Sequence, residues 1–154
     1  HLKDRKYVFG DKPSYGDFGL WGQIYNSWTD PTPRKFIEKD FSDLLPWIER
    51  MLSPKDEGEY ESWNSLSATL MPILKEEVAE IFLPWTSEIT KAMSEEKEEL
   101  SVIIRDKEFK HSIGGPQKYH VKSFAVLKKK YDSFKDNEAL TNILSEANCL
   151  DFLI

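Results

Sequence analysis

Histidine, cysteine and paired carboxylates are the side chains of this chain that could do chemistry, and their spacing limits what they can do. His1, His111 and His120 are far apart in the sequence, no histidine has a second one at i+4, and there is no cysteine pair. Zinc sites need several such ligands at short, regular spacing. The sequence therefore predicts no metal site, and the histidines give no catalytic residue.

Cys149 is the single cysteine and has two interpretations. It could act as a nucleophile, but it lies between Asn148 and Leu150 in an apolar C-terminal stretch, where a buried, unreactive thiol is the more common outcome. We expect the buried thiol. A single cysteine also excludes an internal disulfide, which makes a reducing cytoplasm the expected compartment and leaves secretion open.

The acidic run SEEKEEL, residues 94–100, offers paired carboxylates that could serve as general acid and base. Such work needs a carboxyl group whose pKa is raised by burial or by a like charge, and nothing apolar surrounds this run. A solvated helix face is the expected structure. No glycine-rich phosphate loop follows a strand either, so we assign no catalytic residue and no cofactor to this chain.

Composition sets further limits on the function. The chain has 154 residues, 40% of them hydrophobic, so a single helical domain over residues 1–154 can bury a core without disulfides or metal. With 21 Lys and Arg against 27 Asp and Glu, the net charge of −6 disfavours nucleic acid as a partner. The apolar runs are far shorter than the ~20 residues that cross a bilayer, so no membrane partner is expected.

The stretch KPSYGDFGLWGQIY, residues 12–25, predicts the start of a helix. Ser14 is the expected N-cap, and Asp17 three residues later can accept from the Ser14 N–H, as Glu or Gln does in a capping box. The helix is expected to run to about Trp28, because the two prolines of TDPTP cannot continue it. Apolar residues cover most of its girth, which predicts a buried, central helix.

Gly16, Gly19 and Gly22 are spaced by three inside this helix, where each costs about 0.8–1.0 kcal/mol relative to alanine. A ridge without side chains would let a neighbouring helix approach to backbone contact, so we interpret the three glycines as a helix crossing. The alternative is that they are tolerated defects in a short helix.

Trp21 and Tyr25 lie on the same helix and also have two interpretations. They could line a flat apolar pocket for a hydrophobic ligand, or they could be ordinary core residues. The second is the more common fate of aromatic residues on an apolar helix face.

The rest of the chain is predicted to be mostly helical, which gives an all-α fold class, a helical bundle. Residues 34–52 are interrupted by Pro46 and fit one kinked helix or two short ones, and residues 53–62 form a loop. Further helices are expected at residues 63–83, 84–93, 119–131 and 137–147, the last capped by Asp136 or Asn137, with a small β-hairpin near residues 100–113.

The N-terminal motif resembles the capping region of the glutathione S-transferase superfamily. GDKPSYGDFGLWGQIY, residues 10–25, is similar to the family's loop with proline followed by Ser-x-x-Asp at the start of the core helix of its C-terminal helical domain. DPTP, WIERML and PQKYHVKSFAVLKKKY also resemble a bacterial branch of the superfamily. The resemblance implies that Ser14 and Asp17 serve folding, and that Trp21 and Tyr25 lie near the side that receives the hydrophobic substrate.

The resemblance also implies what this chain lacks. Family members place a thioredoxin-like domain first, which supplies the residue that activates the glutathione thiol, and nothing here has that pattern. The expected function is therefore that of a C-terminal helical domain in a parent for which glutathione is the co-substrate, so whether this chain belongs to an enzyme is left open. The alternative is a stand-alone helical module for protein interaction or hydrophobic-ligand binding. The expected partners are the missing thioredoxin-like domain and a second copy in a homodimer.

Overall fold

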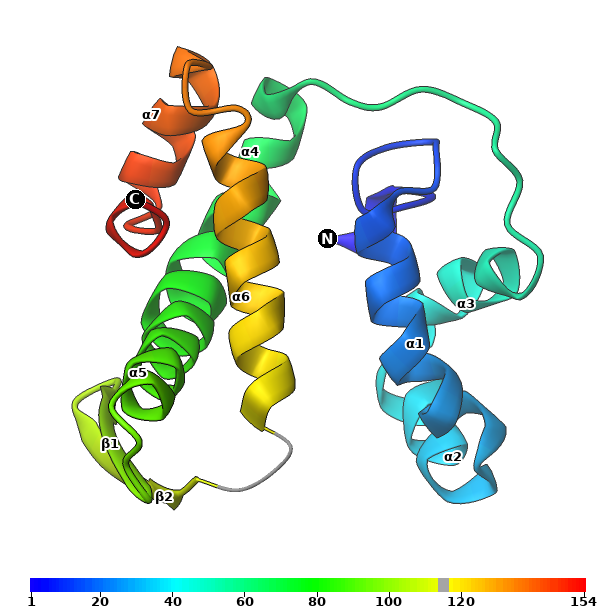
Figure 1. The fold of residues 1–154 in the computed structure, drawn as a ribbon. Helices are drawn as coiled ribbons and strands as arrows, with labels where there is room; N and C mark the ends of the chain where they lie inside the picture. Colours follow the sequence, from blue (N-terminus) through cyan, green and yellow to red (C-terminus); the bar gives the residue numbers. More distant parts are fainter. Residues whose placement is uncertain (114–116) are drawn as a thin grey trace. The chain divides into compact units, whose positions relative to one another are not determined.

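A computed structural model describes residues 1–113 and 117–154 (Figure 1). The Gly-Gly-Pro break predicted at residues 114–116 lies outside the described residues. The chain divides into two compact units, His1–Leu70 and Met71–Ile154, where its length predicted a single domain. The physical reason is that the buried apolar side chains gather in separate clusters, each made within one unit.

The first unit is built from short helices that follow one another closely. Proline ends or begins several of them: Pro31 opens α2 after the N-cap Asp30, whose carboxylate accepts from the Thr32 N–H at 2.9 Å. Pro46 lies in the first turn of α3, so the interrupted pattern of residues 34–52 forms two α-helices. The helices are α1 (Tyr15–Thr29), α2 (Pro31–Asp40), α3 (Leu45–Leu52) and the start of α4 (Trp63–Ile73), with 3₁₀ turns at Leu2–Asp4 and Ser42–Leu44.

The core of the first unit lies between α1, α2, α3 and the N-terminal segment. Its buried members are Tyr7, Ile37, Trp47, Ile48 and Met51. Helix α1 contributes only one face, through the partly buried Trp21, Ile24 and Trp28. The prediction of a central helix buried all round is therefore wrong, since Phe18, Leu20 and Tyr25 remain about half exposed.

The second unit pairs two long helices and a hairpin. Figure 1 shows α5 (Leu83–Ser94) beside α6 (Gln117–Asp132), with the strands β1 (Glu99–Ile104) and β2 (Lys107–Ser112) near the end of α5. α7 (Glu138–Glu146) and a 3₁₀ turn at Leu150–Phe152 complete it. The predicted hairpin is confirmed: β1 and β2 are antiparallel, and Arg105 and Asp106, both at positive φ, make the two-residue turn between them.

A π-helix, η3 (Leu74–Phe82), joins α4 to α5, where the sequence predicted regular helix. The Leu83 N–H bonds to the Val78 carbonyl, five residues back, and the next residue, Pro84, has no N–H to donate. Proline therefore still marks the start of a new helix, as expected. The structure is mostly helical with one small two-stranded sheet, which confirms the coarse fold class.

Candidate functional site

Asp17, at the start of α1, is the most heavily bonded side chain of the first unit and is completely buried. Its Oδ2 accepts from the Ser14 N–H at 2.9 Å and from the Ser14 hydroxyl at 2.6 Å. The Asp17 N–H in turn donates to Ser14 Oγ, so the predicted capping box is confirmed. The local spacing of the sequence was sufficient to find this part of the site.

The other carboxylate oxygen of Asp17 makes two bonds that the sequence did not predict. Oδ1 accepts from the Val8 N–H at 2.8 Å and from the Trp47 indole N–H at 2.9 Å. One carboxylate therefore joins the N-terminal segment, the first turn of α1 and helix α3. With four donors directed at it and no exposed surface, this carboxylate is a structural centre rather than a general base.

Gly10 holds the segment that carries Val8, and only glycine fits at this position. Gly10 has φ +127, and a Cβ at this position would lie 2.8 Å from the Glu61 backbone nitrogen and 2.9 Å from the Glu59 carbonyl oxygen. The Tyr7 N–H donates to the Gly10 carbonyl, and the Glu61 N–H donates to the Phe9 carbonyl. This close backbone packing fixes Val8 beside Asp17.

The glycines of α1 do not mark a helix crossing within the first unit. A Cβ built on Gly19 or Gly22 would meet no atom within 4 Å, so the ridge has open space where a neighbouring helix was predicted. Gly16 is close to other atoms, but these are Phe9, Ser14 and Val8 of the preceding loop. The reason is geometric: Gly19 and Gly22 lie on the side of α1 opposite the stripe that packs on the core.

Trp21 and Tyr25 come together as a pair at the edge of the core. Their rings meet edge to face at 5.3 Å, and Trp21 makes a second such contact with Trp47 at 5.9 Å. Trp21 is partly buried, whereas Tyr25 is 46% exposed. The core interpretation therefore describes Trp21, and an apolar ligand side formed with Tyr25 stays a prediction.

The histidines, the cysteine and the acidic run that could do chemistry are distant from Asp17 in the sequence or already have partners. His1 bonds to the Thr69 hydroxyl at 2.6 Å and the Val8 carbonyl at 2.7 Å, while the His111 ring lies tilted against the Trp85 ring, with 5.5 Å between their centroids. Among the described residues, no group of three or more His, Cys, Asp or Glu side chains is placed to hold a metal ion.

Cys149 is buried, as predicted. It belongs to a cluster with Ala79, Leu83 and Phe124, and its thiol contacts the Leu74 and Ala147 carbonyls. Burial raises the pKa of the Cys149 thiol, which disfavours the nucleophilic thiolate.

The acidic run is solvated but is not a helix face. Helix α5 ends at Ser94, residues 95–98 are exposed along the turn that leads into β1, and Glu99 is exposed as the first residue of that strand. The Lys97 ammonium bonds to Glu95 and lowers the pKa of that carboxyl group. A general acid at neutral pH needs the opposite shift.

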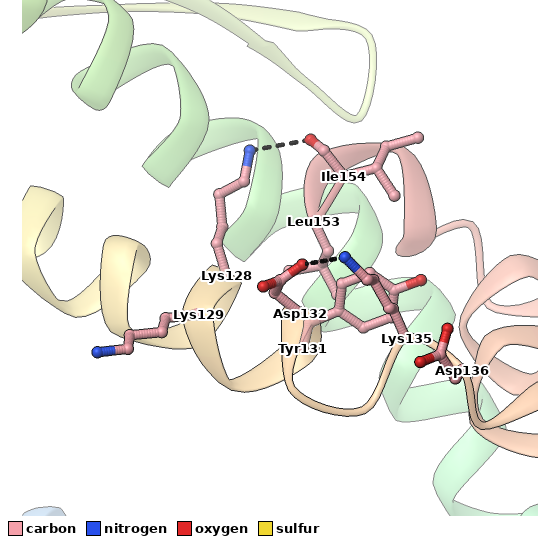
Figure 2. A pocket seen from close by; sticks show the side chains of 8 residues that line it. All are labelled: Lys128, Lys129, Tyr131, Asp132, Lys135, Asp136, Leu153 and Ile154. Carbon is pink, nitrogen blue, oxygen red and sulfur yellow. Dashed lines mark hydrogen bonds and ion pairs between the residues drawn. The ribbon is translucent and has the colours of Figure 1, made fainter.

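The second unit has a surface hollow of about 770 Å³ with several charged side chains on its rim (Figure 2). Lys128 Nζ donates to the Ile154 carbonyl at 3.0 Å, and Lys135 Nζ lies 2.8 Å from Asp132 Oδ1. The hydrogen bond that Lys135 donates to Asp132 raises the pKa of Lys135, so this lysine is not an activated amine. The lining residues are Lys128, Lys129, Tyr131, Asp132, Lys135, Asp136, Leu153 and Ile154.

Comparison with known proteins adds no relative to these observations. No family model, no curated protein and no solved structure matches the chain. No helix among the described residues is both long and apolar enough to span a membrane.

Proposed function

We propose that this chain is the helical scaffold of a glutathione S-transferase-like protein and that it provides the apolar side of the substrate site. The parent protein would lower the thiol pKa of glutathione in a thioredoxin-like domain and present the thiolate to an electrophile. The proposal assigns no catalytic residue to these 154 residues.

The capping box of Ser14 and Asp17 is the observation that carries this proposal. It has the sequence, the reciprocal hydrogen bonds and the burial expected of a capping motif that serves folding. The half-exposed Tyr25 and Phe18 beside it supply apolar surface of the kind that an electrophilic substrate needs.

Binding of two related ligands tests whether this chain binds the apolar substrate while a separate thioredoxin-like domain binds glutathione. S-hexylglutathione carries an apolar chain, whereas glutathione has only the peptide that a thioredoxin-like domain would hold. We expect the hexyl conjugate to quench tryptophan fluorescence of the full chain, and glutathione alone to leave it unchanged. Tyr25→Ala should weaken the response, and Tyr119→Ala, which changes an exposed tyrosine of the second unit, should not.

An assay of catalysis by the chain itself could overturn the proposal. With glutathione and a chromogenic electrophile, the purified chain should give the uncatalysed rate. Turnover well above that rate, or binding of glutathione as strong as that of its hexyl conjugate, would place the thiol-activating site in this chain and overturn the proposal.

A second candidate is a stand-alone helical module for protein interaction or hydrophobic-ligand binding. The half-exposed apolar residues of α1 favour it, because exposed apolar surface promotes association. The coding sequence upstream of His1 separates the two candidates: a thioredoxin-like sequence there favours the transferase, and a start codon directly before His1 favours the module.

A further inference from the structure

The hairpin of the second unit has one protected strand and one open strand. Leu100 and Val102 of β1 are buried, and α5 packs against that strand. Every residue of β2 is exposed, and the sheet of the described residues has only these two strands. Within the part of the chain that the structure describes, no strand pairs with the outer edge of β2, which is a row of backbone donors and acceptors.

The register shows which residues of β2 direct their backbone groups outward. The Ile113 N–H donates to the Glu98 carbonyl at 2.7 Å, so Glu98 and Ile113 form a hydrogen-bonded pair next to the sheet. Such pairs alternate along an antiparallel ladder, and Val102 opposite Phe109 is therefore also hydrogen-bonded. The N–H and C=O groups of the alternate residues Glu108 and Lys110 must then point to the free edge.

The sequence of this edge is complementary to itself when two copies run antiparallel about Phe109. In that register Phe109 faces Phe109 of the second copy, and Glu108 faces Lys110 in both directions. The pairs of Glu108 with Lys110 are the hydrogen-bonded ones, since those residues have the outward backbone groups. Charge, side-chain face and backbone direction all agree in this single register.

We propose that two copies of this chain pair through the outer edges of β2, forming a continuous four-stranded antiparallel sheet with Phe109 on the two-fold axis.

The charges of β2 support a second copy as the occupant of the edge. Lysines on an edge strand normally prevent pairing, because they would meet like or unpaired charges. Here Lys110 of each copy would instead meet the Glu108 carboxylate of the other, on a face where Glu108 already lies 3.6 Å from its own Lys110, while Lys107 would face His111. The Ser101 hydroxyl donates to Glu108 at 2.7 Å and helps to lower the pKa of that carboxyl group, which keeps it charged at neutral pH.

Phe109 gives the apolar part of the contact. It is 46% exposed on the same face of the hairpin as Val102, the face against which α5 packs. Residues that face each other in a pair without hydrogen bonds have Cα atoms about 4.5 Å apart, so the two phenyl rings would cover each other. This inference concerns the second unit and does not depend on the transferase proposal.

Charge exchange tests the pairing on the full chain. Glu108→Lys and Lys110→Glu each place like charges opposite one another twice, so sedimentation equilibrium should show dimer dissociation constants raised about tenfold or more. The double variant Glu108→Lys/Lys110→Glu restores opposite charges and should return the constant to near the wild-type value. Circular dichroism checks that each variant is folded.

Disulfide trapping tests the register independently of charge. The separation expected at the two-fold position suits a disulfide, so Phe109→Cys should form a covalent dimer under mild oxidation. Ile103→Cys is the matched control: Ile103 is 69% exposed on the other strand, so this variant should form no covalent dimer, and the native Cys149 is buried. A monomeric wild type, a dimer insensitive to charge reversal, failure of the double variant to restore pairing, or equal trapping at both positions would overturn the proposal.

Discussion

Two polar side chains are fully buried among the described residues, one in each unit, and their surroundings are opposite. Asp17 in the first unit accepts from four donors on three segments of the chain. Thr86 in the second unit is 1% exposed, and its hydroxyl has no hydrogen-bond partner among the described residues. The first unit is thus organised around a satisfied charge, and the second is held by apolar packing that includes an unpaired hydroxyl.

The difference indicates how each unit should respond to substitution. A buried carboxylate with four donors concentrates stability at one residue, because its removal leaves several donors unpaired at once. An unpaired hydroxyl costs free energy while it is present, so its removal should be favourable. Replacing the buried polar group should therefore lower the stability of the first unit and raise that of the second.

Asp17→Ala should have the largest effect. It leaves the backbone N–H groups of Val8 and Ser14 and the indole N–H of Trp47 without an acceptor, and we expect the first unit to lose about 4 kcal/mol of stability. Hydrogen exchange would report each unit separately. Tryptophan fluorescence would follow mainly the first, since four of the five tryptophans lie in residues 1–70.

Two variants sharpen this test. Asp17→Asn keeps one acceptor oxygen and should lose less stability than Asp17→Ala. Asp40→Ala, which removes an exposed carboxylate at the end of α2, should stay within about 0.5 kcal/mol of the wild type. Equal effects of Asp17→Ala and Asp40→Ala would contradict the central role of Asp17.

Gly10→Ala should come next, with a loss of about 2–3 kcal/mol, because φ +127 strains any L side chain and the new Cβ would meet backbone atoms of Glu59 and Glu61. The displaced segment would also move the Val8 N–H away from Asp17. Urea unfolding followed by tryptophan fluorescence measures the change. A loss well under 1 kcal/mol would show that this loop adapts and that Asp17 does not depend on it.

The contrast between these residues also shows what the sequence could reveal. The Ser14–Asp17 pair and the hairpin were predictable because both depend on residues that are close in the chain. The bonds from Val8 and Trp47 to Asp17 were not, since no spacing rule connects these residues, which lie 9 and 30 positions from Asp17. The division into two compact units could not be read from the sequence either, because the helical pattern of residues 63–94 continues through the boundary at Leu70 without a change of composition.

Thr86→Val should stabilise the second unit by about 1 kcal/mol. Valine has nearly the shape of threonine and removes a buried hydroxyl that has no partner among the described residues. The exchange rates of amides in α5 and α6 should fall, and those of the first unit should not change. A loss of stability would mean that the hydroxyl is bonded after all, and the contrast with Asp17 would then fail.

Gly19→Ala should give a gain of similar or slightly smaller size, because glycine in a helix interior costs about 0.8–1.0 kcal/mol relative to alanine and the new methyl group meets nothing within 4 Å. Asp17 and Gly19 lie only two residues apart in α1, so the variants with the largest expected loss and with an expected gain of stability are on the same helix. Thermal unfolding of the full chain measures the gain, with Gly22→Ala as an equivalent position on the same open side. If both variants are destabilised, another surface packs on this ridge in solution and the glycines mark a crossing after all.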